Sequence, residues 1–200
     1  MFASSSLKQL AEMLQASGDK NKITSDCTEL AGELDSAIAK YGIVKHPVHD
    51  MIYAYECDGY GNYLMMDDAG LPGLVSIPYL RNEIMIDEIY NNTRKFALSE
   101  ENPYFFQSNI AEGIGSPHLA SKGNMIWPMG IIARAITSTH DDEIAKCLKM
   151  LKATHAGKGF MHEGFNKNNP SDYTRSWFAW ANSFFGEMIW KVYLERKKLL

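Results

Sequence analysis

Hydrophobic residues recur every three or four positions along most of this chain, which is the spacing that one buried face of an α-helix requires. Leucine and alanine follow this spacing over residues 7–14. A second pattern over 27–38 starts behind Thr24-Ser25-Asp26 and stops at Gly42. The same spacing predicts further helices over 86–93, 128–136, 144–151 and about 175–195, and one more that begins near Leu71-Pro72. About seven helices are expected, so the predicted fold class is mainly α.

Turn-forming residues and the ends of the predicted helices mark the other segments of the chain. Residues 51–66 place aromatic residues around a glycine-rich turn, which predicts a small β-hairpin or an extended loop. Residues 99–124 carry several prolines and glycines and are expected to form a long irregular loop, a kind of segment that is often functional. Asn82 stands where it can cap the helix over 86–93, and Pro128 takes the favoured first position of a helix. The helix over 175–195 is apolar nearly all round, as a buried helix would be.

Length and composition narrow the class of protein. Two hundred residues with 46% hydrophobic content suit one globular domain over residues 1–200. A net charge of −4 with scattered cations argues against a nucleic-acid partner. Nothing approaches the ~18 consecutive apolar residues that a membrane span needs, so no membrane partner is expected. Three widely spaced cysteines and the lack of a secretory signal at residues 1–4 favour reduced thiols and a cytoplasmic protein.

Several familiar catalytic motifs are broken or absent. Asp67-Asp68 would begin a magnesium-binding Asp-Asp-x-x-Asp run, but its fifth position is Leu71. The segment "HEGFN" at 162–166 lacks the second histidine of a zinc-binding helix, and the six histidines show no paired ligand spacing. There is no Gly-x-Ser-x-Gly segment, and no cysteine has the local context of a nucleophile. The sequence therefore predicts no catalytic metal and no cofactor.

The aspartate pair also has a purely structural interpretation. An aspartate ahead of a helix accepts hydrogen bonds from backbone amides that the helix leaves unpaired. Adjacent residues cannot both cap the same helix. One of Asp67 and Asp68 is therefore expected to cap, and the other to face a pocket. Gly70 and Gly73, close behind the pair, are expected to loosen the start of that helix.

The remaining candidates are carboxylates that stand among tryptophan, tyrosine, histidine, asparagine and arginine. Aromatic rings stack on the apolar face of a sugar, polar side chains bind its hydroxyls, and a pair of acids breaks the glycosidic bond. Glu163 lies between a histidine and a glycine and precedes the aromatic run "RSWFAW". This combination indicates a carbohydrate pocket, in which Glu163 needs a second carboxylate as its partner.

Six blocks of the sequence together resemble glycoside hydrolase family 125, and they occur in the order of that family. They are "YECDGYGN", "MDDAGLPGLVSIPYL", "NPYFFQ", "GIGSPH", "IWPMGIIARAITS" and "FMHEGFNKNNPSDYTRSWFAWANSFFGE". The resemblance extends over residues 1 to about 195 and includes the opening "MFASSSLKQLAEML". It implies an exo-acting, inverting, metal-independent α-1,6-mannosidase with an (α/α)₆ barrel. Seven of the twelve helices of such a barrel are expected here, so the resemblance implies a partial barrel.

The resemblance also assigns roles. Glu163 matches the glutamate of the family's Phe-Met-His-Glu-Ser-Phe-Asn motif and is the expected general base, with Gly164 in place of serine. The family's general acid is an aspartate of an Arg-Pro-Ser-Asp-Asp segment upstream of the opening block, and this chain has no such segment. The expected substrate pocket comprises Asp67, Asp68, His118, Trp127, His162, Asn166, Arg175 and Trp177. For Trp127 and Trp177 core packing is an equal alternative, for His118 a place in a surface loop, and for Arg175 an ion pair with Glu163 or Asp172.

The expected partner is a mannose-containing oligosaccharide or N-glycan, together with the N-terminal half of the barrel. A second hypothesis is a non-catalytic fragment or split-gene product that binds mannosides weakly. A third, a helical interaction protein, predicts exposed aromatic stripes without polar pocket residues. The retained Asp, His, Asn and Arg residues argue against this third hypothesis.

Overall fold

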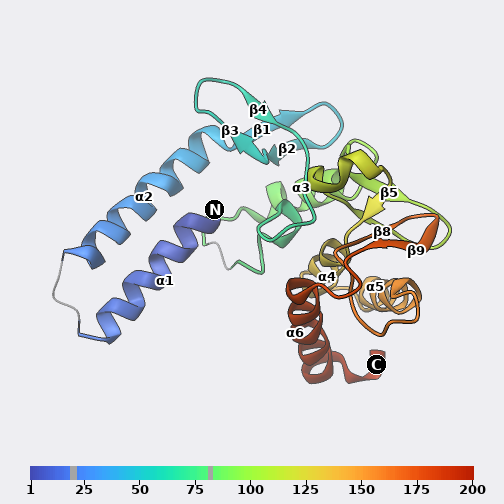
Figure 1. The fold of residues 1–200 in the computed structure, drawn as a ribbon. Coiled ribbons are helices and arrows are strands. Elements are labelled where there is room, and N and C mark those ends of the chain that lie inside the picture. Colours follow the sequence, from blue (N-terminus) through green and yellow to red (C-terminus); the bar gives the residue numbers. More distant parts are fainter. Residues whose placement is uncertain (19–21, 81–82) are drawn as a thin grey trace. The chain divides into compact units, whose positions relative to one another are not determined.

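A computed structural model describes residues 1–18, 22–80 and 83–200 of the chain (Figure 1). The described residues form six α-helices, three short 3₁₀ helices and nine short strands, so helices account for about half of them. The chain divides into two compact units, one made of residues 1–65 and 77–95 and the other of 66–76 and 96–200. The single domain over 1–200 stays a prediction.

The first unit begins with two helices, α1 (Phe2–Ala16) and α2 (Ile23–Tyr41), which lie side by side (Figure 1). Small residues fill their interface, with Ala11 and Ala31 almost inaccessible to solvent. The buried hydroxyl of Ser4 donates to the carboxylate of Asp35, which also binds Lys8 Nζ at 2.9 Å. The helical spacing therefore predicted both helices, although it is alanines rather than leucines that lie fully buried between them.

Short antiparallel strands complete the first unit. The strand β1 (Ile43–His46) pairs with β2 (Asp50–Tyr53), and β3 (Glu56–Cys57) pairs with β4 (Tyr63–Leu64). The second hairpin confirms the one expected within 51–66. At its turn, the Asp58 carboxylate accepts hydrogen bonds from the amides of Tyr60 and Asn62, and Gly59 and Gly61 have positive φ.

The helix α3 (Asp87–Ala97) runs from the first unit into the second. Its Thr93 hydroxyl accepts a hydrogen bond of 2.8 Å from the Tyr53 amide, which ties the helix to β2. The expected cap, Asn82, lies outside the described residues.

The core of the second unit surrounds α4 (Pro128–Ile136), which packs against α5 (Asp141–Thr154) and α6 (Ala179–Arg196). Pro128 takes the first helical position as predicted, and Trp127 immediately precedes it. Met129 and Ile132 of α4 are fully buried, and so are Phe165 and Met188 from later in the chain. Because α4 is enclosed in this way, the loop before it and the strands beside it are held firmly.

Two predictions about the last helix are wrong. It begins at Ala179 rather than near Arg175, because Arg175 has a positive φ and Phe178 is extended, neither of which fits an α-helix. It is also not buried all round in this chain: Trp180 and Trp190 are 46% and 61% exposed. Only one face of α6 meets α4, and the buried residues all lie on that face.

Short strands occupy the region expected to be irregular. The strand β5 (Phe105–Gln107) pairs with β6 (Glu112–Ile114), and β7 (Met125–Ile126), β8 (Gly164–Asn166) and β9 (Asn169–Thr174) form a three-stranded antiparallel sheet. In this sheet Ile126 pairs with Phe165. After β6, Gly115 lies so close to the backbone of Met125 that a β-carbon there would be 2.2 Å from its carbonyl oxygen. The 3₁₀ helix η2 (Pro117–Lys122) follows.

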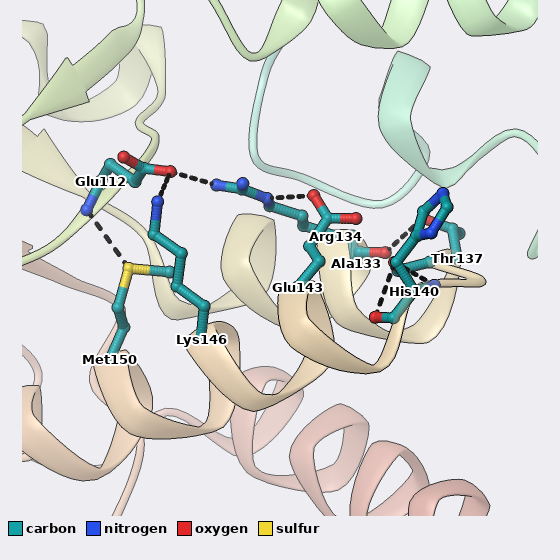
Figure 2. A network of polar contacts seen from close by, with 9 residues as sticks. Glu112, Ala133, Arg134, Thr137, His140, Glu143, Lys146 and Met150 are labelled. Carbon is teal, nitrogen blue, oxygen red and sulfur yellow. Dashed lines mark hydrogen bonds and ion pairs between the residues drawn. The ribbon is translucent and has the colours of Figure 1, made fainter. Parts of the chain in front are cut away.

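Ion pairs join β6 to α4 and α5 within the second unit (Figure 2). The Arg134 guanidinium contacts Glu112 Oε1 through Nη1 and Glu143 Oε1 through Nε, both at 2.7 Å. Lys146 Nζ lies 2.5 Å from the same oxygen of Glu112. Burial raises the pKa of Glu112, but the two cations outweigh burial and hold that pKa below its usual value. This network fixes the strand that leads into the Gly115-Ser116 turn.

Candidate active site

Asp67 has a structural role in this chain. Its side chain is completely buried, and Oδ1 accepts hydrogen bonds from the amides of Leu74, at 2.6 Å, and Asp68, while Oδ2 accepts from Val75. These amides belong to the 3₁₀ helix η1 (Leu74–Ser76) or precede it, so the prediction that one aspartate caps a following helix is confirmed. Burial raises the pKa of Asp67 to about 7, although the backbone amides act in the opposite direction.

The segment after the aspartates corrects two predictions. No α-helix begins near Leu71-Pro72; only the single turn of η1 forms, and the Leu74 and Val75 amides that bond Asp67 are those of its first residues. Gly73 does not loosen this segment. A β-carbon at Gly73 would lie 2.4 Å from the Asp68 carbonyl oxygen and 3.1 Å from Asp67 Oδ1, so the tight turn requires glycine.

Asp68 is half-buried and faces different partners. Its Oδ1 accepts a hydrogen bond from the Gly70 amide at 3.0 Å, and its Oδ2 accepts one from the Ser116 hydroxyl at 3.2 Å. The Ala69 amide also bonds the Gly115 carbonyl, which holds the aspartate loop against the turn after β6. Of the two aspartates, Asp68 is the one whose carboxylate reaches partners outside its own loop.

Trp127 connects the Ser116 turn to the Glu163 segment. Its ring centroid lies 6.4 Å from that of His118, an exposed residue whose amide donates to Ser116 Oγ. On its other side, a β-carbon at Gly164 would lie 3.2 Å from Trp127 Nε1. The indole is buried, and Nε1 has no hydrogen-bond partner in the described structure. Trp127 thus lines the backbone immediately after Glu163.

His162 is buried beside Glu163 as a neutral ring. It stacks on Tyr173 with 3.9 Å between centroids, and its Nδ1 lies 3.1 Å from the Ser176 carbonyl oxygen. A carbonyl can only accept, so the proton resides on Nδ1 and Nε2 carries the lone pair. Burial lowers the pKa of His162, which favours this neutral form. Nε2 has no hydrogen-bond partner within the described chain.

Glu163 lies at the centre of this arrangement. Its side chain is 14% exposed, and Oε1 lies 3.3 Å from Nε of Arg175. The Arg175 guanidinium lies over the ring of Phe178 at 5.4 Å, and Phe178 meets Trp127 edge-on at 6.3 Å. Since Trp127 borders Gly164, the contacts form a closed ring that starts and ends at the Glu163 segment. This ring holds a nearly buried carboxylate among aromatic side chains.

A chain of contacts that runs through Ser116 and Phe178 connects seven of the nine predicted site residues, namely Asp67, Asp68, His118, Trp127, His162, Glu163 and Arg175. Two others contribute differently. Asn166 Oδ1 accepts a hydrogen bond from the Asn168 amide and shapes the turn between β8 and β9. Trp177 is 55% exposed, so full core packing does not describe it. Two of the three described buried side-chain atoms without a hydrogen-bond partner, Trp127 Nε1 and His162 Nε2, flank Glu163.

Residues that sequence reasoning did not single out also build the site. Ser116 binds Asp68, Tyr173 stacks on His162, and Phe178 supports both Arg175 and Trp127. The aromatic run pointed to Phe178 only as one ring among several. For Ser116 and Tyr173 the sequence offered no signal, because their partners lie 48 and 11 residues away along the chain.

Comparison of the sequence with known protein families assigns this chain to one of them. The model of the metal-independent α-mannosidases, glycoside hydrolase family 125, matches residues 1–190. The chain belongs to this family. Within residues 1–18, 22–80 and 83–200, no group of three or more His, Cys, Asp or Glu side chains is placed to hold a metal ion.

Two relatives show how much of a family 125 protein this chain represents. It is 45% identical over 192 residues to the meiotically up-regulated gene 157 protein of Schizosaccharomyces pombe, covering 96% of this chain and 37% of that protein. It is 35% identical, with a TM-score of 0.90, to a metal-independent α-mannosidase of Streptococcus pneumoniae that was solved in a non-productive complex with α-1,6-mannobiose. That match covers 97% of this chain and 46% of the solved one, so the chain spans less than half of either relative.

No helix in the described parts of the chain is long and apolar enough to cross a membrane. Cys27 and Cys147 are buried and Cys57 is exposed, and no disulfide joins these three cysteines.

Proposed function

We propose that this chain carries the general-base side of an inverting exo-α-1,6-mannosidase site. One observation carries the proposal: Glu163 is a nearly buried carboxylate, held by Arg175 within a ring of aromatic contacts. In the proposed reaction a water oxygen attacks C1 of the terminal mannose while its proton passes to Glu163. The bond between C1 and the glycosidic oxygen breaks, and the departing sugar takes a proton from a second carboxylate.

The identity of the second carboxylate is the next part of the proposal. Both oxygens of Asp67 accept backbone hydrogen bonds in a fully buried environment, so Asp67 has no route to a leaving group. Asp68 is half-buried and linked to the cluster through Ser116, so it is the residue to test as the acid within this chain. Otherwise the acid belongs to the part of family 125 proteins that this chain does not span, as the resemblance implied.

The exposed face of α6 fits the same interpretation. Trp190 and Tyr193 stack there with 5.8 Å between centroids, and both rings are more than 40% exposed. Large exposed apolar surfaces on a folded protein favour association. We propose that in a whole family 125 protein, with a complete (α/α)₆ barrel, other helices cover this face.

Hydrolysis of two substrates tests the proposal. Mannobiose with an α-1,6 linkage needs both base and acid, whereas α-mannosyl fluoride releases fluoride, which leaves with little need of protonation. The wild-type chain is expected to hydrolyse the fluoride and to release β-mannose, as seen by proton NMR. Glu163→Gln is expected to lower kcat about 10²- to 10⁴-fold, because it removes the general base.

Asp172→Asn is the matched control, because Asp172 is an exposed carboxylate on β9, in the same hairpin. It should leave both rates unchanged. Activity on the fluoride with none on mannobiose would place the acid outside this chain. If Asp68→Asn abolishes hydrolysis of mannobiose but not of the fluoride, Asp68 is the acid. A folded wild-type chain that releases α-mannose, or that hydrolyses neither substrate, would refute the catalytic proposal.

A second candidate function is mannoside binding without catalysis. Trp177 and Trp180, 55% and 46% exposed, follow Arg175 and offer apolar faces of the kind on which pyranose rings stack. Calorimetric titration with α-1,6-mannobiose tests this candidate. Binding that Trp177→Ala weakens, in a chain without hydrolysis of either substrate, would favour it.

A further inference from the structure

Arg175 adopts a backbone conformation that arginine rarely tolerates. Its φ is +50°, and only Asp50, Asn124 and Ala156 share a positive φ among the described non-glycine residues. Aspartate and asparagine enter this region comparatively easily because their short side chains bond the local backbone. A long arginine side chain gains no such help. Strained backbone of this kind concentrates at functional sites, where the surrounding structure enforces it.

The conformation brings three consecutive residues onto the Glu163 segment. The Thr174 carbonyl accepts a hydrogen bond of 3.2 Å from the Glu163 amide, and the Ser176 carbonyl accepts one from His162 Nδ1. Between them, Arg175 turns its side chain onto the Glu163 carboxylate, with Nε 3.3 Å from Oε1. Hydrogen bonds thus anchor the carbonyl groups on both sides of Arg175, one to the Glu163 amide and the other to the His162 ring.

Stability does not explain why an arginine occupies this position. Its side chain is 64% exposed, and ion pairs that involve such exposed groups contribute little to folding. Strain at φ +50° opposes whatever the pair contributes. The Phe178 ring beneath the guanidinium does, however, fix its direction. The arrangement therefore orders one carboxylate without stabilising the fold appreciably.

We propose that Arg175 is a positioning residue for Glu163, an inference that rests on the proposed function. Its guanidinium holds Oε1 and so orients Oε2 to accept the proton of the attacking water. The water oxygen forms the new bond to C1, the bond to the leaving group breaks, and the proton stays on Glu163 until it returns to solvent. Arg175 itself exchanges no proton in this step.

Kinetics with α-mannosyl fluoride test this role, because the reaction of that substrate depends on the base alone. Arg175→Asn removes the cation while asparagine tolerates the positive φ, and Arg175→Lys retains a cation without the planar fork. Arg175→Asn is expected to lower kcat about 10- to 100-fold with KM changed less than about 2-fold, as for a misplaced catalytic group. Arg175→Lys and added guanidinium at millimolar concentration should each restore part of kcat.

Ala156→Gly is the matched control. It relieves a similar positive φ of +51° at a residue seven positions before Glu163 in the chain and should leave kcat unchanged. Thermal unfolding of Arg175→Asn should match the wild type or exceed it, because the strain is reduced.

The outcomes separate the two proposals. An active wild type whose kcat survives Arg175→Asn would overturn the positioning role alone. A large rise in KM with kcat intact would overturn it in favour of a substrate contact. A fall in unfolding temperature that accounts for the lost activity would overturn it in favour of a structural role. An inactive, folded wild type would overturn both the proposed function and this role.

Discussion

Two cations share one oxygen of Glu112, and the structure predicts that they contribute very differently to stability (Figure 2). Arg134 and Lys146 both contact Oε1, at 2.7 and 2.5 Å. The Arg134 side chain is 12% exposed, whereas that of Lys146 is 51% exposed. The perturbations are Arg134→Met and Lys146→Met, which replace each cation with an unbranched apolar side chain.

The magnitudes follow from burial. Arg134→Met leaves the carboxylates of Glu112 and Glu143, 14% and 18% exposed, without the cation between them. Breaking a pair of this kind costs about 3 kcal/mol, because a nearly buried charge loses its compensation. Lys146→Met removes an exposed partner while Arg134 remains, which costs about 0.5 kcal/mol. Although burial lowers the pKa of Arg134, its hydrogen bonds to Glu112 and Glu143 outweigh burial and raise that pKa, so the guanidinium stays charged.

Urea denaturation followed by tryptophan fluorescence measures both effects. All four tryptophans lie in the second unit, which also contains the network, so the signal reports on the relevant part of the chain. The folded-state pKa of Glu112 is lowered, so its contribution is present above the unfolded pKa and disappears as pH falls through the folded one. The difference between wild type and Arg134→Met should therefore shrink below about pH 4. Equal losses for the two variants, or a difference that persists in acid, would refute the reasoning.

The aspartate loop supports two further predictions. The pKa of Asp67 is raised to about 7 in the folded state. Its contribution to stability is therefore complete below the unfolded pKa and is lost as pH rises through 7. Unfolding free energies measured from about pH 4 to 8 should show this loss in wild type but not in Asp67→Asn. Asp67→Asn should also cost about 2 kcal/mol at pH 5, because one amide loses its acceptor, and an unchanged midpoint in urea would contradict this. Gly73→Ala should lower the free energy of unfolding by at least about 2 kcal/mol, because its β-carbon would press on the Asp68 carbonyl. In Gly70→Ala the β-carbon meets nothing nearer than 3.6 Å, so that variant should lose less than about 1 kcal/mol. Thermal unfolding of the two glycine variants compares them directly, and similar losses would show that the loop can move aside.

Helices were the predictable part of the fold because their signal is local. Pro128 opens α4 and Gly42 caps α2 where the sequence indicated, and the glycine turn near Asp58 forms its hairpin. The strands of the second unit were missed because they are short, from two to six residues, and carry no alternating pattern long enough to detect. Their pairing joins residues far apart, as with Met125 and Asn166. The start of α6 was misplaced because the positive φ of Arg175 and the extended backbone of Phe178 leave no signal in the residue pattern.

The sequence by itself determined the family, through six blocks in order, and named Glu163 as the expected base. It also indicated a pocket of carboxylates and aromatic rings, because residue types and their spacing are visible in one dimension. It could not divide the roles of Asp67 and Asp68, which are chemically identical neighbours. The tertiary structure decided between them: backbone amides of η1 surround the first in a buried site, and a hydroxyl 48 residues along the chain binds the second. It likewise placed Arg175 on Glu163, because a single positive φ and a ring beneath the guanidinium are properties of the folded chain alone.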